Sequence, residues 1–168
     1  VSHCVTSSKR EIYVEELQKY IHVDIFGACS GVSPCVRDMS PGNNNAERCM
    51  KNVIEKYRFY LSFENTFCAD YVTEKFSRVL GSVNVIPVVL GGADYANILP
   101  KNSYIDIRDF GSVQDLAEYL HEVASNDALY NQYIEAKMSY RCTYAATFMC
   151  DLCAYLHNHR YRSRWSST

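Results

Sequence analysis

A group of polar side chains between two apolar segments is the part of this chain best suited to chemistry. Residues 57–63 place apolar side chains at period two, and residues 85–90 form a continuous apolar run followed by two glycines. These patterns predict two strands, the second one buried on both faces. The polar residues between them are Glu64, Asn65, Asp70, Tyr71, Thr73, Glu74 and Lys75. They follow the carboxyl end of a strand and lead into a helix, which is where open α/β sheets bind ligands.

Two cations in the sequence are candidates for binding an anion such as a phosphate. Arg10 lies one turn into a predicted helix after a small polar loop, so its guanidinium and the backbone N–H groups of the helix start could converge on one anion. Lys75 lies in the helix that follows the polar group. By residue type alone, Arg10 is as consistent with an ordinary exposed arginine as with an anion-binding one, and a lysine on a helix surface is usually solvated. Glu74, taken alone, is more simply half of a charge pattern on a helix surface.

The rest of the pattern predicts strands and helices in alternation. Strands are predicted at residues 23–26, 58–63, 85–90 and 104–107. Helices are predicted at 9–20, capped by Ser7 or Ser8, at 46–57, at 71–80, from the cap Ser112 to 124, and at 128–140. Residues 28–45 and 93–100 are predicted to be loops. This alternation predicts an α/β fold, a Rossmann-like lobe with a mainly parallel sheet covered on both faces and joined by right-handed crossovers.

The composition is that of one folded domain that does not bind nucleic acid. The chain has 168 residues, of which 48% are hydrophobic and 13% aromatic, enough for a sizeable core. Its net charge of -2, with both signs mixed, gives no long-range attraction to DNA, RNA or an anionic membrane. The basic residues at 160–164 are interpreted as a solvated end of the chain. Any phosphate binding must therefore be local.

Eight cysteines point to an oxidising compartment. Their connectivity cannot be chosen from the sequence, because eight thiols allow about 105 complete pairings. The pair Cys150 and Cys153, followed by His157 and His159, invites a zinc hypothesis, but its spacing fits no common zinc finger. We therefore expect disulfides at these cysteines and no bound metal.

Several sequence motifs together resemble glycosyltransferase family 10, the α1,3-fucosyltransferases. The motifs are FENT (63–66), DYVTEK (70–75) and IPVVLGGADY (86–95), with VSHC and Arg10 near the start, VDIFGAC from Val23 and FMCDLC (148–153). The resemblance covers nearly the whole chain. Within the family, SHC, LGGADY and CDLC look most similar to members that modify the core of N-glycans.

The resemblance implies a fold, a domain organisation and an activity. The chain would be the carboxyl-terminal half of a two-lobed glycosyltransferase-B fold, with a GDP-fucose-binding lobe at 1–141 and a Cys-rich appendage of the same domain at 142–168. The whole protein would transfer L-fucose from GDP-fucose, with inversion, to the 3-hydroxyl of N-acetylglucosamine in glycoprotein glycans, and it would need no cofactor. The alternative is a non-catalytic GDP-sugar-binding module or a truncated inactive product. An unrelated dinucleotide-binding Rossmann enzyme is disfavoured because GxGxxG is absent.

The resemblance also implies roles for individual residues. Arg10 and Lys75 would bind the donor diphosphate, and Glu74 would stabilise positive charge on the fucose ring. The remaining donor-binding residues would be Asn65, Tyr71 and Val72. Outside this set, Glu64 is expected to order the loop, and Thr73 and Asp70 to cap a helix. Family members hold the base that deprotonates the acceptor in the other lobe, so the base is absent from this chain and the isolated fragment is expected to be inactive.

The surroundings of the protein follow from the same resemblance. Family members are type II Golgi membrane proteins with a luminal catalytic part, and their terminal CxxC cysteines, here Cys150 and Cys153, pair with cysteines elsewhere in the protein. No apolar run in this chain approaches the roughly 20 residues of a membrane span. We therefore expect the anchor and the acceptor lobe to lie upstream. The chain departs from many relatives at Cys68, a possible reactive thiol, and at residues 76–84.

Overall fold

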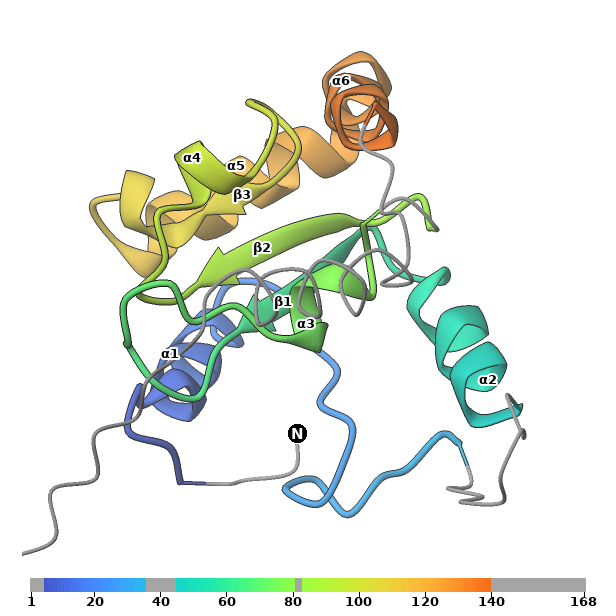
Figure 1. Cartoon of the computed structure of the whole chain (residues 1–168), viewed down its shortest axis with the longest axis vertical. Helices are drawn as coiled ribbons and strands as arrows, with labels where there is room; N and C mark the ends of the chain where they lie inside the picture. Colours follow the sequence, from blue (N-terminus) through green and yellow to red (C-terminus); the bar gives the residue numbers. More distant parts are fainter. Residues whose placement is uncertain (1–4, 36–44, 81–82, 140–168) are drawn as a thin grey trace, which may run out of the picture.

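A three-stranded parallel sheet forms the centre of the fold. The computed structural model describes residues 5–35, 45–80 and 83–139. Strands β1 (Phe59–Phe63), β2 (Ile86–Leu90) and β3 (Ile105–Asp106) pair in the order β1-β2-β3, with Phe59 opposite Ile86 and Val88 opposite Ile105. The elements around the sheet are α1 (Arg10–Leu17), α2 (Asn45–Ile54), α3 (Glu74–Ser77), α4 (Tyr95–Ile98), η1 (Ile107–Asp109), α5 (Val113–Ser125) and α6 (Asp127–Met138). The predicted α/β class with a parallel sheet is confirmed (Figure 1).

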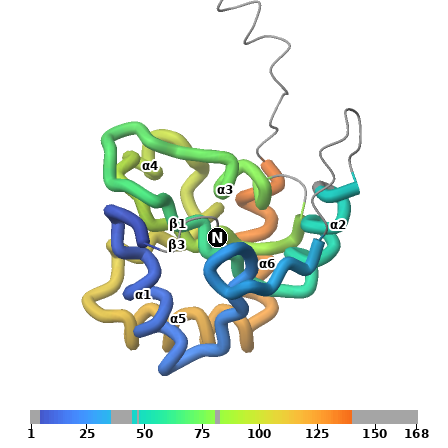
Figure 2. The backbone as a smooth tube through the Cα atoms, turned by 90° about the horizontal axis from the view of Figure 1, so that it is seen from below, coloured from blue at the N-terminus to red at the C-terminus, as the bar shows by residue number. Residues whose placement is uncertain are grey.

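Both faces of the sheet are covered by helices. Every residue of β2 is buried, as predicted for a continuous apolar run. Its side chains at Ile86, Val88 and Leu90 pack into a core cluster that contains Leu17 of α1 and Leu116 of α5. The alternate residues of the strand face a second cluster around Phe76 and Tyr95. Figure 2 shows the resulting layers, with α1 and α5 on one side of the sheet and α3 and α4 on the other.

The two helices predicted after residue 112 are present as α5 and α6, close to their predicted bounds. Ser112 accepts a hydrogen bond from the backbone N–H of Asp115 at 3.1 Å, which is the predicted cap of α5. Asn126 caps α6 in the same way, through the N–H of Leu129 at 3.1 Å. The helix predicted at 9–20 is shorter than expected, because α1 ends at Leu17.

Two local predictions are wrong. Residues 23–26 form no strand, and this part of the chain contains only an isolated bridge between Gly27 and Val32. Its polar side chains bond to other parts of the fold, since Asp24 accepts a hydrogen bond from Tyr57 at 2.7 Å. The predicted loop at 93–100 contains the short helix α4, whose first residue, Tyr95, is buried.

One buried cation was not predicted. Lys137 of α6 is fully buried, and its ammonium donates to the backbone carbonyls of Val79 and Val85 (both 2.8 Å) and of Val83. Burial lowers the pKa of Lys137 to about 8. These three hydrogen bonds from one side chain link α6 to the segment between α3 and β2.

Disulfides are present, as the cysteine content suggested. Cys35 and Cys49 form one and tie the end of the described loop to α2. Cys29 is also disulfide-bonded, and Cys68 is an exposed free thiol. The predicted disulfide candidates Cys150 and Cys153, with the whole of the appendage at 142–168, lie outside the described residues. Among the described helices, none is both long and apolar enough to cross a membrane.

Candidate functional site

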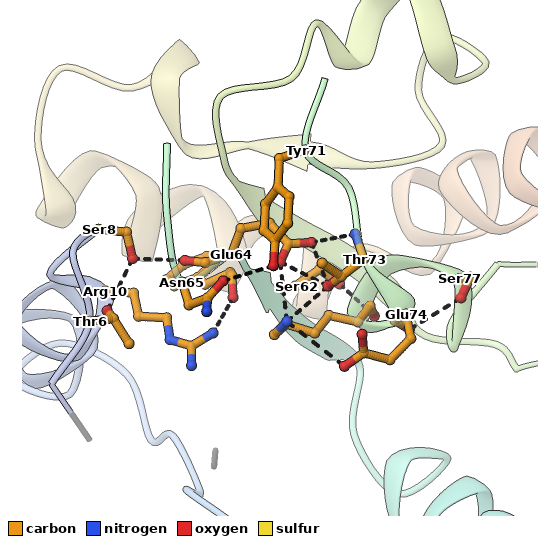
Figure 3. Close-up of polar contacts among 12 residues, drawn as sticks. Thr6, Ser8, Arg10, Ser62, Glu64, Asn65, Tyr71, Thr73, Glu74 and Ser77 are labelled. Carbon is orange, nitrogen blue, oxygen red and sulfur yellow. Dashed lines mark hydrogen bonds and ion pairs between the residues drawn. The ribbon is translucent and has the colours of Figure 1, made fainter. Parts of the chain in front are cut away.

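A buried carboxylate organises the polar loop at the carboxyl end of β1. Glu64 follows the last residue of the strand and has an exposed fraction of 1%. The backbone N–H and the hydroxyl of Thr73 both donate to its Oε1 at 2.8 Å, and the hydroxyl also lies 2.8 Å from Oε2. The ammonium of Lys75 donates to Oε2 at 3.1 Å. Glu64 thus orders the loop, as the sequence suggested, and it also fixes one of the two candidate cations (Figure 3).

Lys75 is held in place while keeping a donor for a ligand. Its ammonium also donates to Thr73 Oγ1 at 2.8 Å, and it lies 3.8 Å from Glu74 Oε1, beyond hydrogen-bond distance. An ammonium has three N–H donors, and the two short contacts use two of them. The side chain is 22% exposed, so the third donor can meet an incoming group.

Arg10, the second candidate cation, is the first residue of α1 and is buried, with an exposed fraction of 7%. Its Nη1 donates to the carbonyl of Phe63 at 2.6 Å, and its Nε is buried without a hydrogen-bond partner among the described residues. A buried polar atom without a partner is uncommon in native proteins and calls for an explanation, for example a ligand.

The loop before α1 is attached to the same end of β1. Ser8 donates to the carbonyl of Glu64 at 2.7 Å, and Ser7 donates to the carbonyl of Asn65 at 3.0 Å. The predicted cap is therefore wrong, because these hydroxyls bind a distant strand end, whereas the residue before α1 is Lys9, with φ 52°. This attachment brings Arg10 to the carboxyl end of β1.

Three of the predicted donor-binding residues lie in the loop between β1 and α3. The hydroxyl of Tyr71 donates to Asn65 Oδ1 at 3.2 Å, which leaves the amide nitrogen of Asn65 directed elsewhere. Val72 packs its side chain against the cluster that contains Phe76, so only its backbone remains for a ligand. Figure 3 shows the labelled side chains spread across the end of β1, with Arg10 on one side and Glu74 on the other side, next to Ser77.

Two capping predictions and one helix start are corrected here. The predicted helix at 71–80 begins only at Glu74, because Glu64 holds Thr73 in an extended conformation with φ -116° and ψ -177°. Thr73 precedes the helix, but its hydroxyl bonds to Glu64 and makes no cap hydrogen bond. Asp70 is not a cap, since it lies in a turn four positions earlier with φ 59°.

Two glycines allow the loops to approach each other closely. A Cβ on Gly92 would lie 2.5 Å from the carbonyl oxygen of Cys68, and a Cβ on Gly91 would lie 2.4 Å from the hydroxyl of Tyr95. Tyr95 thus packs under the site, where burial and the nearby carboxylate of Glu64 raise its pKa to about 12. Only a residue without a side chain fits at either glycine position.

The arrangement is suited to an anion with two charged groups. Arg10 and Lys75 come from different elements and each keeps an unused N–H, while Glu74 is largely exposed, with 61% of its side chain accessible. Among the described residues, no group of three or more His, Cys, Asp or Glu side chains is placed to hold a metal ion. The site as described therefore offers fixed cationic side chains and hydrogen-bond donors.

Comparison with known sequences gives a consistent result. The profile described as "Glycosyltransferase family 10 (fucosyltransferase) C-term" matches residues 1–167. "Alpha-(1,3)-fucosyltransferase C" of Drosophila melanogaster is 46% identical over 94% of this chain and 35% of the relative. "Glycoprotein 3-alpha-L-fucosyltransferase A" of the same organism is 40% identical over 98% and 32%. Human "GDP-fucose protein O-fucosyltransferase 3" is 37% identical over 82% and 29%. The chain thus spans about a third of the length of these relatives.

Comparison with solved structures supports the fold. A crystal structure of an α1,3-fucosyltransferase with GDP superposes with a TM-score of 0.69 at 16% identity, over 95% of this chain and 46% of that one. A second, with GDP-fucose, gives 0.61 at 21% identity, over 86% and 39%. The chain has the fold of one part of these proteins. The matching family profile describes a carboxyl-terminal part, as predicted.

Proposed function

Because the chain belongs to glycosyltransferase family 10, we propose that it is the donor-binding lobe of an enzyme that uses GDP-fucose. The whole protein would transfer L-fucose, with inversion, to the 3-hydroxyl of N-acetylglucosamine in glycoprotein glycans. The names of the two Drosophila melanogaster relatives support the linkage. The observation that carries the donor assignment is the buried, unpartnered Nε of Arg10, at the same strand end as the partly used ammonium of Lys75.

The proposed chemistry is a single displacement. A base outside this chain takes the proton of the acceptor hydroxyl, the acceptor oxygen forms a bond to the anomeric carbon, and the bond from that carbon to the β-phosphate oxygen breaks. Arg10 and Lys75 stabilise the charge that remains on the departing GDP. Fixed cations do this without reorganisation, and one such contact is worth roughly 2.7 to 4 kcal/mol in comparable sites.

Two carboxylates have different tasks in this proposal. Glu74 is exposed at the rim and supports the positive charge that develops on the fucose ring. Glu64 is buried and touches no substrate; it is a positioning residue that fixes Lys75 and the backbone of Thr73. Asn65 and Tyr71 supply neutral hydrogen bonds to the donor, and the backbone of Val72 completes the set.

A second acceptor class is supported by one group of relatives. Human GDP-fucose protein O-fucosyltransferase 3 matches most of this chain at 37% identity, and a hydroxyl of a protein would be its counterpart of the glycan hydroxyl. The proposed donor site would serve either acceptor equally well. Transfer assays with the whole protein, on a glycan panel and on a protein substrate, distinguish the two.

The rest of the protein is proposed from the same relatives. An amino-terminal acceptor lobe would supply the base, and a membrane anchor would place the catalytic part in the Golgi lumen. The disulfide between Cys35 and Cys49 is consistent with such an oxidising compartment. No metal or other cofactor is required, since the cationic side chains take over charge stabilisation.

The test of the proposal is calorimetry on this chain. GDP and GDP-fucose should bind with similar affinity, and ADP should bind more weakly. The isolated chain should transfer no fucose to an N-glycan, because the hydroxyl that receives fucose and the base that deprotonates it would be positioned by residues outside this chain. A folded sample that binds no GDP at saturating concentration would overturn the donor assignment. Fucose transfer by the isolated chain that depends on Glu74 would show that this lobe is a complete enzyme. Binding without activity in the whole protein would favour the non-catalytic module.

A further inference from the structure

A second cavity lies at the free edge of the sheet, apart from the residues assigned to the donor. It has a volume of about 690 Å³ and is bounded by the α4–β3 connection, by η1 and by the facing sides of α5 and α6. This volume is within the range of small-molecule sites. Figure 1 shows β3 at the sheet edge beside α4 and α5. The cavity is lined by four aromatic rings together with charged and polar side chains, which is unlike the apolar core clusters.

The cavity has hydrogen-bonding capacity that the described residues do not use. The hydroxyls of Tyr119 and Tyr133 lie 2.7 Å apart and share one hydrogen bond. Two hydroxyls carry two protons, so one proton needs a further acceptor, and the described residues provide none. Tyr133 is buried, with an exposed fraction of 9%. The carboxylate of Asp109 also lines the cavity, accepts no hydrogen bond from the described residues and lies close enough for its charge to act on Tyr133.

The charges in the cavity do not suit an anion. Asp106 and Arg108 neutralise each other through hydrogen bonds of 2.9 and 3.0 Å from Nε. Arg108 also donates to the carbonyl of Ala93 at 3.1 Å. What remains are the two carboxylates of Asp94 and Asp109 and the ammonium of Lys101, so the remaining negative charges outnumber the positive one. A fitting ligand is therefore uncharged and has hydroxyls that both donate and accept.

We propose that this cavity binds a neutral pyranose sugar of the acceptor glycan, at a unit other than the one that receives fucose. A pyranose offers hydroxyls to Tyr119, Tyr133 and Asp109, and its C–H face packs on rings such as Tyr104. This inference rests on the proposed function, because it takes the glycan to be the acceptor.

The cavity and the donor site share one wall. The buried ring of Tyr95 packs against Phe76 on one side and against Tyr104 of the cavity on the other, at centroid distances of 6.3 and 5.9 Å. Its hydroxyl closes on Gly91, whose position is also next to Glu64. Tyr95 therefore lies between the proposed sugar site and the residues around Glu64.

The test is titration of the 168-residue chain with N,N′-diacetylchitobiose, followed by NMR. We expect weak binding and shifts confined to the cavity residues. Tyr119→Phe and Asp109→Asn should each weaken the disaccharide about fivefold, the cost of one hydrogen bond. Tyr20→Phe and Asp127→Asn, which alter exposed residues outside the cavity, are the matched controls and should change nothing.

GDP titration of the same samples separates the two proposals. If GDP binds normally while the disaccharide does not bind, or binds equally well to both cavity variants, the cavity inference is wrong and the donor proposal stands. If GDP itself fails to bind folded protein, the proposed function fails first. Asp109 is exposed, so its variant keeps the test valid even if Tyr119→Phe is poorly folded.

Discussion

Two buried cations lie at opposite ends of the parallel sheet and differ in how their donors are used. Lys137 lies near the amino end of β2, where three backbone carbonyls accept from its ammonium and use all three of its protons. Arg10 lies at the carboxyl end of β1, where one carbonyl accepts from its Nη1 and its Nε has no described partner. The first cation is complete within the fold and is structural. The second keeps an N–H for a ligand, and we propose it as a binding residue.

The largest expected effect is on stability and concerns Lys137. Lys137→Met leaves three buried carbonyls without their donor and should lower the free energy of unfolding by at least about 3 kcal/mol. Urea denaturation measures this loss. The GDP affinity of the folded variant should stay within about twofold of wild type. A variant as stable as wild type, or one that loses GDP binding while folded, would contradict the assignment of a purely structural role to Lys137.

The next largest effect is on nucleotide binding and concerns Arg10 and Lys75. Arg10→Ala and Lys75→Ala should each weaken GDP by about 2 kcal/mol or more, which is about 30-fold, and should weaken GMP less. The reason is that both cations are assigned to the diphosphate. Calorimetry with both nucleotides is the measurement, and Lys51→Ala, on the exposed face of α2, is the control. Equal losses for GDP and GMP would show that the cations do not contact the β-phosphate.

A smaller effect is expected from the residue that positions Lys75. Glu64→Gln keeps the size of the side chain but removes the charge that fixes Lys75, so GDP affinity should fall about tenfold. The GMP affinity should change less, which a merely structural defect would not produce. Glu118→Gln, on the exposed face of α5, serves as the control. Tighter GDP binding would mean that Glu64 competes with the phosphate for Lys75.

The smallest effect, counted per pH unit, is a pH dependence of the stability that Lys137 contributes. Burial lowers the pKa of Lys137 to about 8, below its ordinary value of 10.5. Between these values the unfolded chain binds a proton that the folded chain does not, so stability rises with pH in that window. The advantage of wild type over Lys137→Met should therefore grow by roughly 1 kcal/mol per pH unit above pH 8. Unfolding of both proteins at several pH values tests this. A constant difference would show that Lys137 stays charged throughout.

Much of the fold followed from local patterns. Residues 58–63 and 85–90 became β1 and β2 nearly within their predicted bounds, and Ser112 caps α5 as predicted. These features depend on periodicity and on contacts between neighbours in sequence. Residues 23–26 failed because a short apolar stretch forms a strand only where another strand pairs with it.

The candidate site was predicted in its residues but not in its contacts. The motif around Lys75 identified the loop, and Glu64 was assigned only to ordering it. That Glu64 holds Lys75, 11 positions away, became visible only in the fold. Lys137 carried no signal at all, because a lysine in a helix is normally solvated and its three partners lie more than 50 positions earlier.

The sequence by itself determined the parallel α/β class, the buried central strand, the family and the position of the polar loop between β1 and α3. These depend on periodicity and on short motifs, which neighbouring residues carry. The tertiary structure decided which cations are used by the fold and which remain open, since that depends on atoms brought together from distant parts of the chain. Arg10 meets Phe63 across 53 positions, and its Nε is buried there without a partner among the described residues.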